Sequence, residues 1–77
     1  MKQFDIALRS FADVQDFVEI ATIQPFRVLV GHDHVWVNAK SFMGLLSLDF
    51  RKPIHVRANC SQVEYDSFRV AAGKYLA

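Results

Sequence analysis

Three histidines offer the first candidate chemistry in this sequence. The segment Gly31-His32-Asp33-His34 places two imidazoles one residue apart with a carboxylate between them, and His55 is the third histidine. Imidazole and carboxylate groups are common ligands of zinc and related metals. A hairpin turn also favours Asp and tolerates His for backbone reasons, and no glutamate base lies nearby. We therefore expect no metal and no cofactor, and keep a metal-binding protein that uses His32 and His34 as an alternative.

Two serines stand directly before apolar runs, where a hydroxyl can have a structural or a regulatory role. Ser10 and Ser41 can each accept a hydrogen bond from the free amides of a helix that begins behind them, so both are predicted N-caps. At Ser41 the helix dipole would also favour the negative charge of a phosphate. Cys60 is the only cysteine, so it cannot form an internal disulfide or a multi-thiolate metal site.

Composition and charge exclude several classes of function. The chain has 77 residues, which predicts a single domain over residues 1–77, and 52% of them are hydrophobic. A formal net charge of +1, with no long basic run, argues against a nucleic-acid partner. No stretch is long and apolar enough for a membrane span, and the first residues do not resemble a signal peptide. We expect a cytoplasmic protein with a protein partner.

The elements that must position these residues follow from hydrophobic periodicity. Alternating patterns predict strands, and a repeat of three to four residues predicts helices. Ser61 and Glu64 form the signature of a capping box before the last helix. The expected elements are a strand over 2–8, a helix from Ser10 to before Pro25, strands at 26–30 and 35–37 joined as a hairpin, a helix from Ser41 through Leu48, a strand at 54–58, and a C-terminal helix along Tyr65, Phe68, Ala72, Tyr75 and Leu76.

The order βαββαβα predicts an α+β fold. Each strand has one apolar face, so one layer of three helices over a four-stranded, mainly antiparallel sheet would bury it. The architecture is an open-faced sandwich.

The segment Val37-Asn38-Ala39-Lys40-Ser41-Phe42-Met43-Gly44-Leu45-Leu46-Ser47-Leu48 resembles the start of the regulatory helix of HPr. HPr is the phosphocarrier protein of the bacterial sugar phosphotransferase system. The element order matches the HPr fold over nearly the full length, although the part after Leu48 is a few residues shorter than in typical members. The resemblance therefore implies an HPr-like open-faced sandwich.

The chain departs from the HPr pattern at the position of the carrier histidine. HPr proteins carry the phosphoryl group on a histidine at the start of the first helix, in a Leu-His-Ala-Arg-Pro type motif. The arginine of this motif helps to hold the phosphate. Counting back from Ser41, these positions fall on Ser10 and Ala12, and the first histidine of the chain is His32. We also expect Asp13 and Asp16 to place negative charge at this helix start, which would repel a phosphate. The sequence thus predicts a member without the carrier histidine.

The resemblance implies a docking surface and a regulatory serine. In HPr proteins the patch that corresponds to this segment contacts phosphotransferase enzymes and a transcriptional regulator, and a dedicated HPr kinase phosphorylates the serine at the position of Ser41. By that resemblance the partner-binding residues are Lys40, Phe42, Met43, Gly44, Leu46 and Ser47. Leu45 and Leu48 are expected in the core, and Gly44 is expected to allow another backbone to approach closely.

The leading hypothesis is therefore a non-enzymatic, HPr-like regulatory protein that docks on a protein partner and is switched by phosphorylation of Ser41. A plain interaction domain that has kept the fold but has no role in the phosphotransferase system would leave the same pattern. The small metal-binding protein remains the third class.

Overall fold

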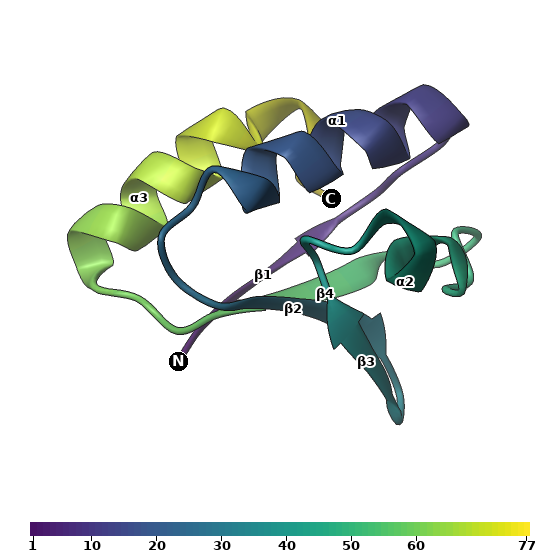
Figure 1. Ribbon diagram of the computed structural model, residues 1–77, viewed down its shortest axis with the longest axis horizontal. Helices are drawn as coiled ribbons and strands as arrows, with labels where there is room; N and C mark the ends of the chain where they lie inside the picture. The colour runs from purple at the N-terminus through teal and green to yellow at the C-terminus, as the bar shows by residue number, and fades with distance from the viewer.

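The computed structural model describes residues 1–77 as a four-stranded sheet with helices on one side (Figure 1). The elements in chain order are β1 (Lys2–Ile6), α1 (Phe11–Thr22), β2 (Val28–His32), β3 (Val35–Asn38), α2 (Phe42–Leu46), β4 (Ile54–Ala58), α3 (Gln62–Ala71) and a short 3₁₀ turn, η1 (Gly73–Tyr75).

The sheet has the strand order β1-β4-β2-β3, and each neighbouring pair is antiparallel. In Figure 1, α1 and α3 lie side by side across one face, and α2 lies beyond the sheet's end near the start of α1. The predicted α+β open-faced sandwich is therefore confirmed. No helix has both the length and the apolar character needed to cross a membrane.

Alternation along the strands decides which face the helices cover. In β4, Ile54, Val56 and Ala58 are fully buried, while His55 and Arg57 point to the opposite, uncovered face. The covering helices supply large aromatic side chains to the buried face. The ring of Phe68 in α3 lies 5.3 Å from that of Phe4 and 5.7 Å from that of Phe26. Burial of each such ring contributes about 1.5–3 kcal/mol to stability.

Three predicted elements each have one wrong boundary. β1 stops at Ile6 and not at Leu8, because the Ala7 amide donates to the carbonyl of Tyr75 instead of to a strand of the sheet. β2 begins at Val28 rather than at Phe26. α2 ends at Leu46, since the Ser47 and Leu48 amides bond to carbonyls only three residues back, which tightens the last turn.

The C-terminal helix is also shorter than the periodicity predicts. α3 ends at Ala71, and the next residues make the separate turn η1 before the chain extends. Leu76, predicted to be helical, forms a β-bridge with Ile6, and the Ala77 amide donates to the Asp5 carbonyl. Residues 75–77, here called the C-terminal segment, therefore run antiparallel to the outer edge of β1.

Candidate functional site

The first turn of α1 is closed by its own side chains. The Ser10 hydroxyl accepts a hydrogen bond from the Asp13 amide at 3.1 Å, and the Asp13 carboxylate accepts one from the Arg9 amide at 2.9 Å. Ser10 is thus the N-cap that the sequence predicts. Ala12, which the resemblance assigned to the position of the HPr arginine, is exposed.

Asp16 does not lie where the sequence analysis expected it. Its carboxylate accepts a hydrogen bond from the Tyr75 hydroxyl and forms an ion pair with Lys74 at 3.1 Å. These partners come from η1, so Asp16 fastens the end of the chain to α1. Only Asp13 places a carboxylate at the start of the helix.

Ser41 begins α2 in the predicted way. Its hydroxyl accepts from the Gly44 amide at 3.2 Å, and its side chain is exposed. Ser47, at the other end of α2, is also exposed and donates to the Gly44 carbonyl at 2.6 Å. Lys40 is half-buried, and its ammonium donates to the Gln24 carbonyl at 2.8 Å. Lys40 is therefore tethered to the loop after α1.

The atoms nearest to Gly44 belong to side chains, whereas another backbone was expected there. A Cβ atom at this position would lie 3.3 Å from the Ser41 hydroxyl oxygen and 3.4 Å from the Cβ of Val37. The crowding atoms belong to side chains, one of which is the cap itself. Gly44 thus leaves room for the Ser41 side chain to close the helix.

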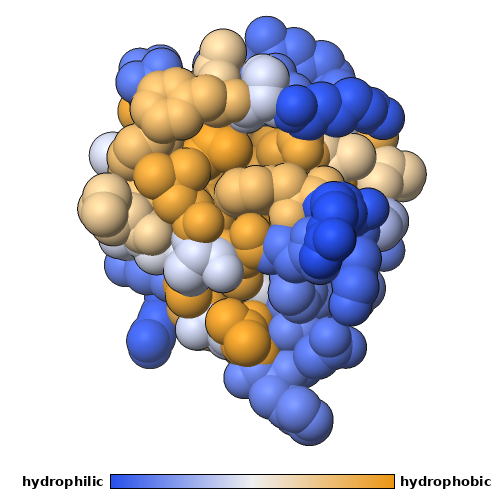
Figure 2. Space-filling model, turned by 90° about the vertical axis from the view of Figure 1, so that its right-hand side faces the viewer, coloured by the Kyte–Doolittle hydropathy of each residue, from blue (hydrophilic) through white to orange (hydrophobic).

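The start of α1 and the exposed side of α2 form one apolar surface, which we call the apolar face: Phe11, Phe42, Met43, Leu46 and Phe50. Met43 is 75% exposed, Phe11 59% and Leu46 37%, whereas Leu45 and Leu48 are buried as predicted. The rings of Phe11 and Phe42 meet edge to face at 5.1 Å. Figure 2, seen from this end of the molecule, shows hydrophobic side chains gathered into a continuous area.

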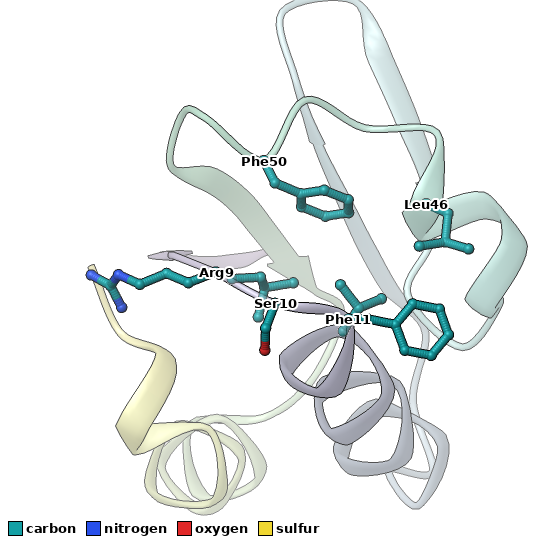
Figure 3. Close-up of a pocket in the computed structure, with 7 residues that line it drawn as sticks. Arg9, Ser10, Phe11, Leu46 and Phe50 are labelled. Atoms are coloured by element: carbon teal, nitrogen blue, oxygen red, sulfur yellow. The ribbon is translucent and has the colours of Figure 1, made fainter.

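A pocket of about 300 Å³ opens in the apolar face. Its lining residues are Leu8, Arg9, Ser10, Phe11, Val14, Leu46 and Phe50. Figure 3 shows Phe50 and Leu46 facing the start of α1, while the Arg9 guanidinium extends away from the pocket. The walls are therefore mainly hydrocarbon, which suits an apolar side chain of a partner better than a charged ligand.

Phe11 and Phe50 are the site residues that sequence reasoning missed. Phe11 precedes Val14 by three residues, so the helical repeat of the sequence predicts that it lies on the buried face of its helix. Phe11 lies in the first turn, where α2 and not the sheet is its neighbour. Phe50 sits in the loop between α2 and β4, outside any periodic pattern. In HPr the docking patch that the resemblance implies lies beside the start of the first helix, and that signal could have found Phe11.

Two side-chain contacts hold the loop that carries Phe50. The Asp49 amide donates to His32 Nε2 at 3.1 Å, so the imidazole fixes the loop to the end of β2. The Asp49 carboxylate accepts from the Arg51 guanidinium at 3.0 and 3.2 Å. These bonds lower the pKa of Asp49 to about 2. The wall of the pocket that Phe50 makes is thus ordered by one contact to the end of β2 and one contact within the loop.

The three histidines do not come together as a metal site. His32 is only 14% exposed and is used as a hydrogen-bond acceptor, His34 is exposed at the turn, and His55 pairs with Asp5 at 2.6 Å. No group of at least three His, Cys, Asp or Glu side chains is placed to hold an ion. The two histidines of the alternative metal site are therefore in different environments, because His32 is the largely buried last residue of β2 and His34 lies exposed in the turn that follows.

Comparisons with known proteins support the fold. No protein-family model matches the chain, and no curated protein matches it. A solved structure, described as the crystal structure of HPr-C-His from Thermoanaerobacter tengcongensis, superposes with a TM-score of 0.69 at 24% sequence identity. The match covers 99% of this chain and 100% of that one. The chain therefore has the HPr fold over its whole length.

Proposed function

We propose that this chain is an HPr-like regulatory protein that docks on a protein partner and carries no phosphoryl group at the start of α1. The observation that carries the proposal is the apolar face, where Phe11, Met43 and Leu46 are exposed around a pocket. Exposed apolar patches that surround a pocket are typical of protein interaction sites. The partner is a protein that inserts an apolar side chain between α1 and α2.

The chemistry at the start of α1 supports the absence of phosphoryl transfer there. Ser10 stands at the carrier position, and its hydroxyl is used to cap Asp13. A serine lacks the neutral imidazole nitrogen that makes reversible phosphoryl transfer near neutral pH possible. The nearest histidine in the sequence is His32, in β2.

Phosphorylation of Ser41 is the proposed switch. The hydroxyl is exposed and only accepts a hydrogen bond, so a kinase can reach it. A phosphate would add about 1.5–2 negative charges beside the apolar face while the helix dipole still favours them. The phosphate would then change the affinity of the apolar face for a partner side chain, while the protein stays folded.

The decisive experiment is incubation of the protein with ATP and an HPr-type kinase. Mass spectrometry should find phosphate on Ser41 and not on Ser10 or Ser47. Ser41→Ala should abolish labelling and lower the free energy of unfolding by about 1 kcal/mol through the lost cap. Ser10→Ala is the matched control: it removes an equivalent cap at a similar cost but should leave labelling intact.

An unmodified Ser41, under conditions that fully phosphorylate a standard HPr, would reject the switch. The docking role would then stand alone, as a plain interaction domain. Docking has its own test, calorimetry with the kinase or with enzyme I. Met43→Ala should weaken the complex by about 1–2 kcal/mol, whereas Val70→Ala, an equally exposed change on α3, should not. Equal effects of the two variants would contradict docking at the apolar face.

A further inference from the structure

The uncovered face of the sheet carries a second group of reactive side chains. The strand registers pair Asp5 with His55, His55 with Gly31, and Gly31 with Trp36, so these four residues form one row across the whole sheet. Gly31 has no side chain, and the Trp36 and His55 rings stack across it with centroids 6.5 Å apart. This row lies on the side of the sheet that α1 and α3 do not cover.

His55 is held in one orientation by a carboxylate. Its Nδ1 lies 2.6 Å from Asp5 Oδ1, so Nδ1–H donates to Asp5 and the lone pair of the neutral ring belongs to Nε2. Nε2 makes no hydrogen bond within the protein. It is not fully buried either, because the sole buried, unpaired side-chain polar atom is His32 Nδ1. The side chain as a whole is 41% exposed.

The other two histidines lack this combination. His32 is largely buried, and its Nε2 already accepts from the Asp49 amide. His34 is exposed at the turn and has no side-chain partner that would fix its tautomer. His55 alone joins an accessible nitrogen with a carboxylate that can stabilise a positively charged ring.

A cation stands beside His55 on the same face. Arg57 follows it by two residues in β4, so both side chains point away from the helices. The Arg57 guanidinium lies 4.0 Å from the centroid of the Trp36 ring, which itself stacks on His55. Arg57 thus supplies a positive charge on the same face as His55, which would favour a group with negative charge on Nε2, while Asp5 remains at the Nδ1 side of the ring.

We propose that His55 accepts a phosphoryl group on Nε2 from an activated phosphate, such as an acyl phosphate or a phosphoramidate. The Nε2 lone pair attacks phosphorus, and the bond from phosphorus to the leaving group breaks. The leaving group departs with that electron pair and takes a proton from water. The ring becomes a cation whose Nδ1–H still donates to Asp5. This site is separate from Ser10 and does not depend on the proposed docking function.

The test uses the purified full-length protein and phosphoramidate at neutral pH. Phosphorus NMR and intact-mass measurements should detect one rapidly formed, acid-labile phosphohistidine, substituted at Nε2. Peptide mapping should place it on His55, at a rate about tenfold above that of His34, which serves as an internal control for an exposed histidine. His55→Gln should remove the rapid phase, and His34→Gln should not affect it.

Two further variants separate chemistry from folding. Asp5→Asn and Arg57→Gln should each slow the rapid phase while circular dichroism shows a folded protein. The ratio of His55 to His34 labelling in the unaltered protein needs no variant at all. Equal labelling of the two histidines, or a rate that Asp5→Asn leaves unchanged in the folded variant, would overturn the proposal and reduce the pair to a cross-strand ion pair.

Discussion

At the scale of single residues, two carboxylates make the free energy of unfolding depend on pH in the acid range. The Tyr75 hydroxyl, and after it Lys74, hold the pKa of Asp16 below its usual value of 3.8. Hydrogen bonds from Arg51 lower the pKa of Asp49 to about 2. A carboxyl whose pKa is lower in the folded state stabilises the fold above its unfolded pKa, and this stabilisation is lost as pH falls through the folded value.

Tyr75→Phe should therefore reduce the dependence of stability on acid pH. The substitution keeps the buried ring and removes the donor to Asp16. The urea midpoint of the variant should fall furthest below that of the unaltered protein at neutral pH, and the difference should shrink below about pH 3. Tyr65→Phe is the control, because the Tyr65 hydroxyl donates to a backbone carbonyl, that of Gln3. A constant difference across this pH range would contradict the role of Asp16.

Contacts within a few residues could be predicted at this scale, and distant ones could not. The caps at Ser10 and Ser41 and the capping box of Ser61 with Glu64 are all confirmed. Each depends on a fixed spacing of three residues within one helix start. The Tyr75–Asp16 and His55–Asp5 pairs join residues 59 and 50 positions apart. Their formation depends on strand register and chain ends, which no local pattern specifies.

At the scale of elements, the β2–β3 hairpin depends on two backbone positions. Asp33 begins its two-residue turn with a φ of 54°, in the left-handed region that few side chains other than Asn and Asp tolerate. Gly31 precedes the turn where the hairpin closes tightly. A Cβ there would lie 1.9 Å from the Val35 carbonyl oxygen. The alternating sequence pattern predicts the hairpin correctly, but it does not reveal the close approach at Gly31.

Gly31→Ala should cost about 3 kcal/mol or more in the free energy of unfolding, because the obstructing atoms are backbone and the hairpin must open. Gly73→Ala is the matched control. No atom lies within 4 Å of the site where its Cβ would stand, and its φ is not positive. That variant should gain about 0.5–1 kcal/mol through a stiffer unfolded chain. Urea denaturation measures both, and a tolerated Gly31→Ala would refute the close approach.

Periodicity predicted the type and order of the four strands and three α-helices, but it missed η1 and several of the boundaries. Tyr75 and Leu76 fit the helical repeat of α3, yet Gly73 follows Ala72 and breaks the helix there. The chain end can then pair with β1. An isolated sequence pattern does not reveal that an unfilled strand edge competes for the same residues.

At the scale of the whole molecule, the C-terminal segment joins three parts of the fold. Tyr75 is 5% exposed and packs against the Phe17 ring of α1 at 6.4 Å. The same segment exchanges backbone hydrogen bonds with Ala7 and Asp5 beside β1. It therefore completes the core and covers part of an edge strand that would otherwise be free to pair with other chains.

Deletion of residues 75–77 should cost about 3–5 kcal/mol, chiefly through the loss of a buried aromatic side chain. For a domain of this size that is a large share of its total stability. Thermal denaturation should show a much lower melting temperature, and the Ala7 amide should exchange rapidly with solvent. Deletion of Ala77 alone, which removes one hydrogen bond to Asp5, should cost about 1 kcal/mol. Similar stabilities of the two truncated proteins would contradict this assignment.

The antiparallel placement of the C-terminal segment also sets how the molecule would respond to mechanical force. Tyr75 lies beside Ala7 and Ala77 beside Asp5, so the chain end points back toward residue 1. Tension between residues 1 and 77 would peel the segment from its free end, and its hydrogen bonds would break one after another at low force. Only then would β1 be pulled along its own axis against β4, where five register pairs resist together. An optical-trap recording should accordingly show a small early extension before the main rupture.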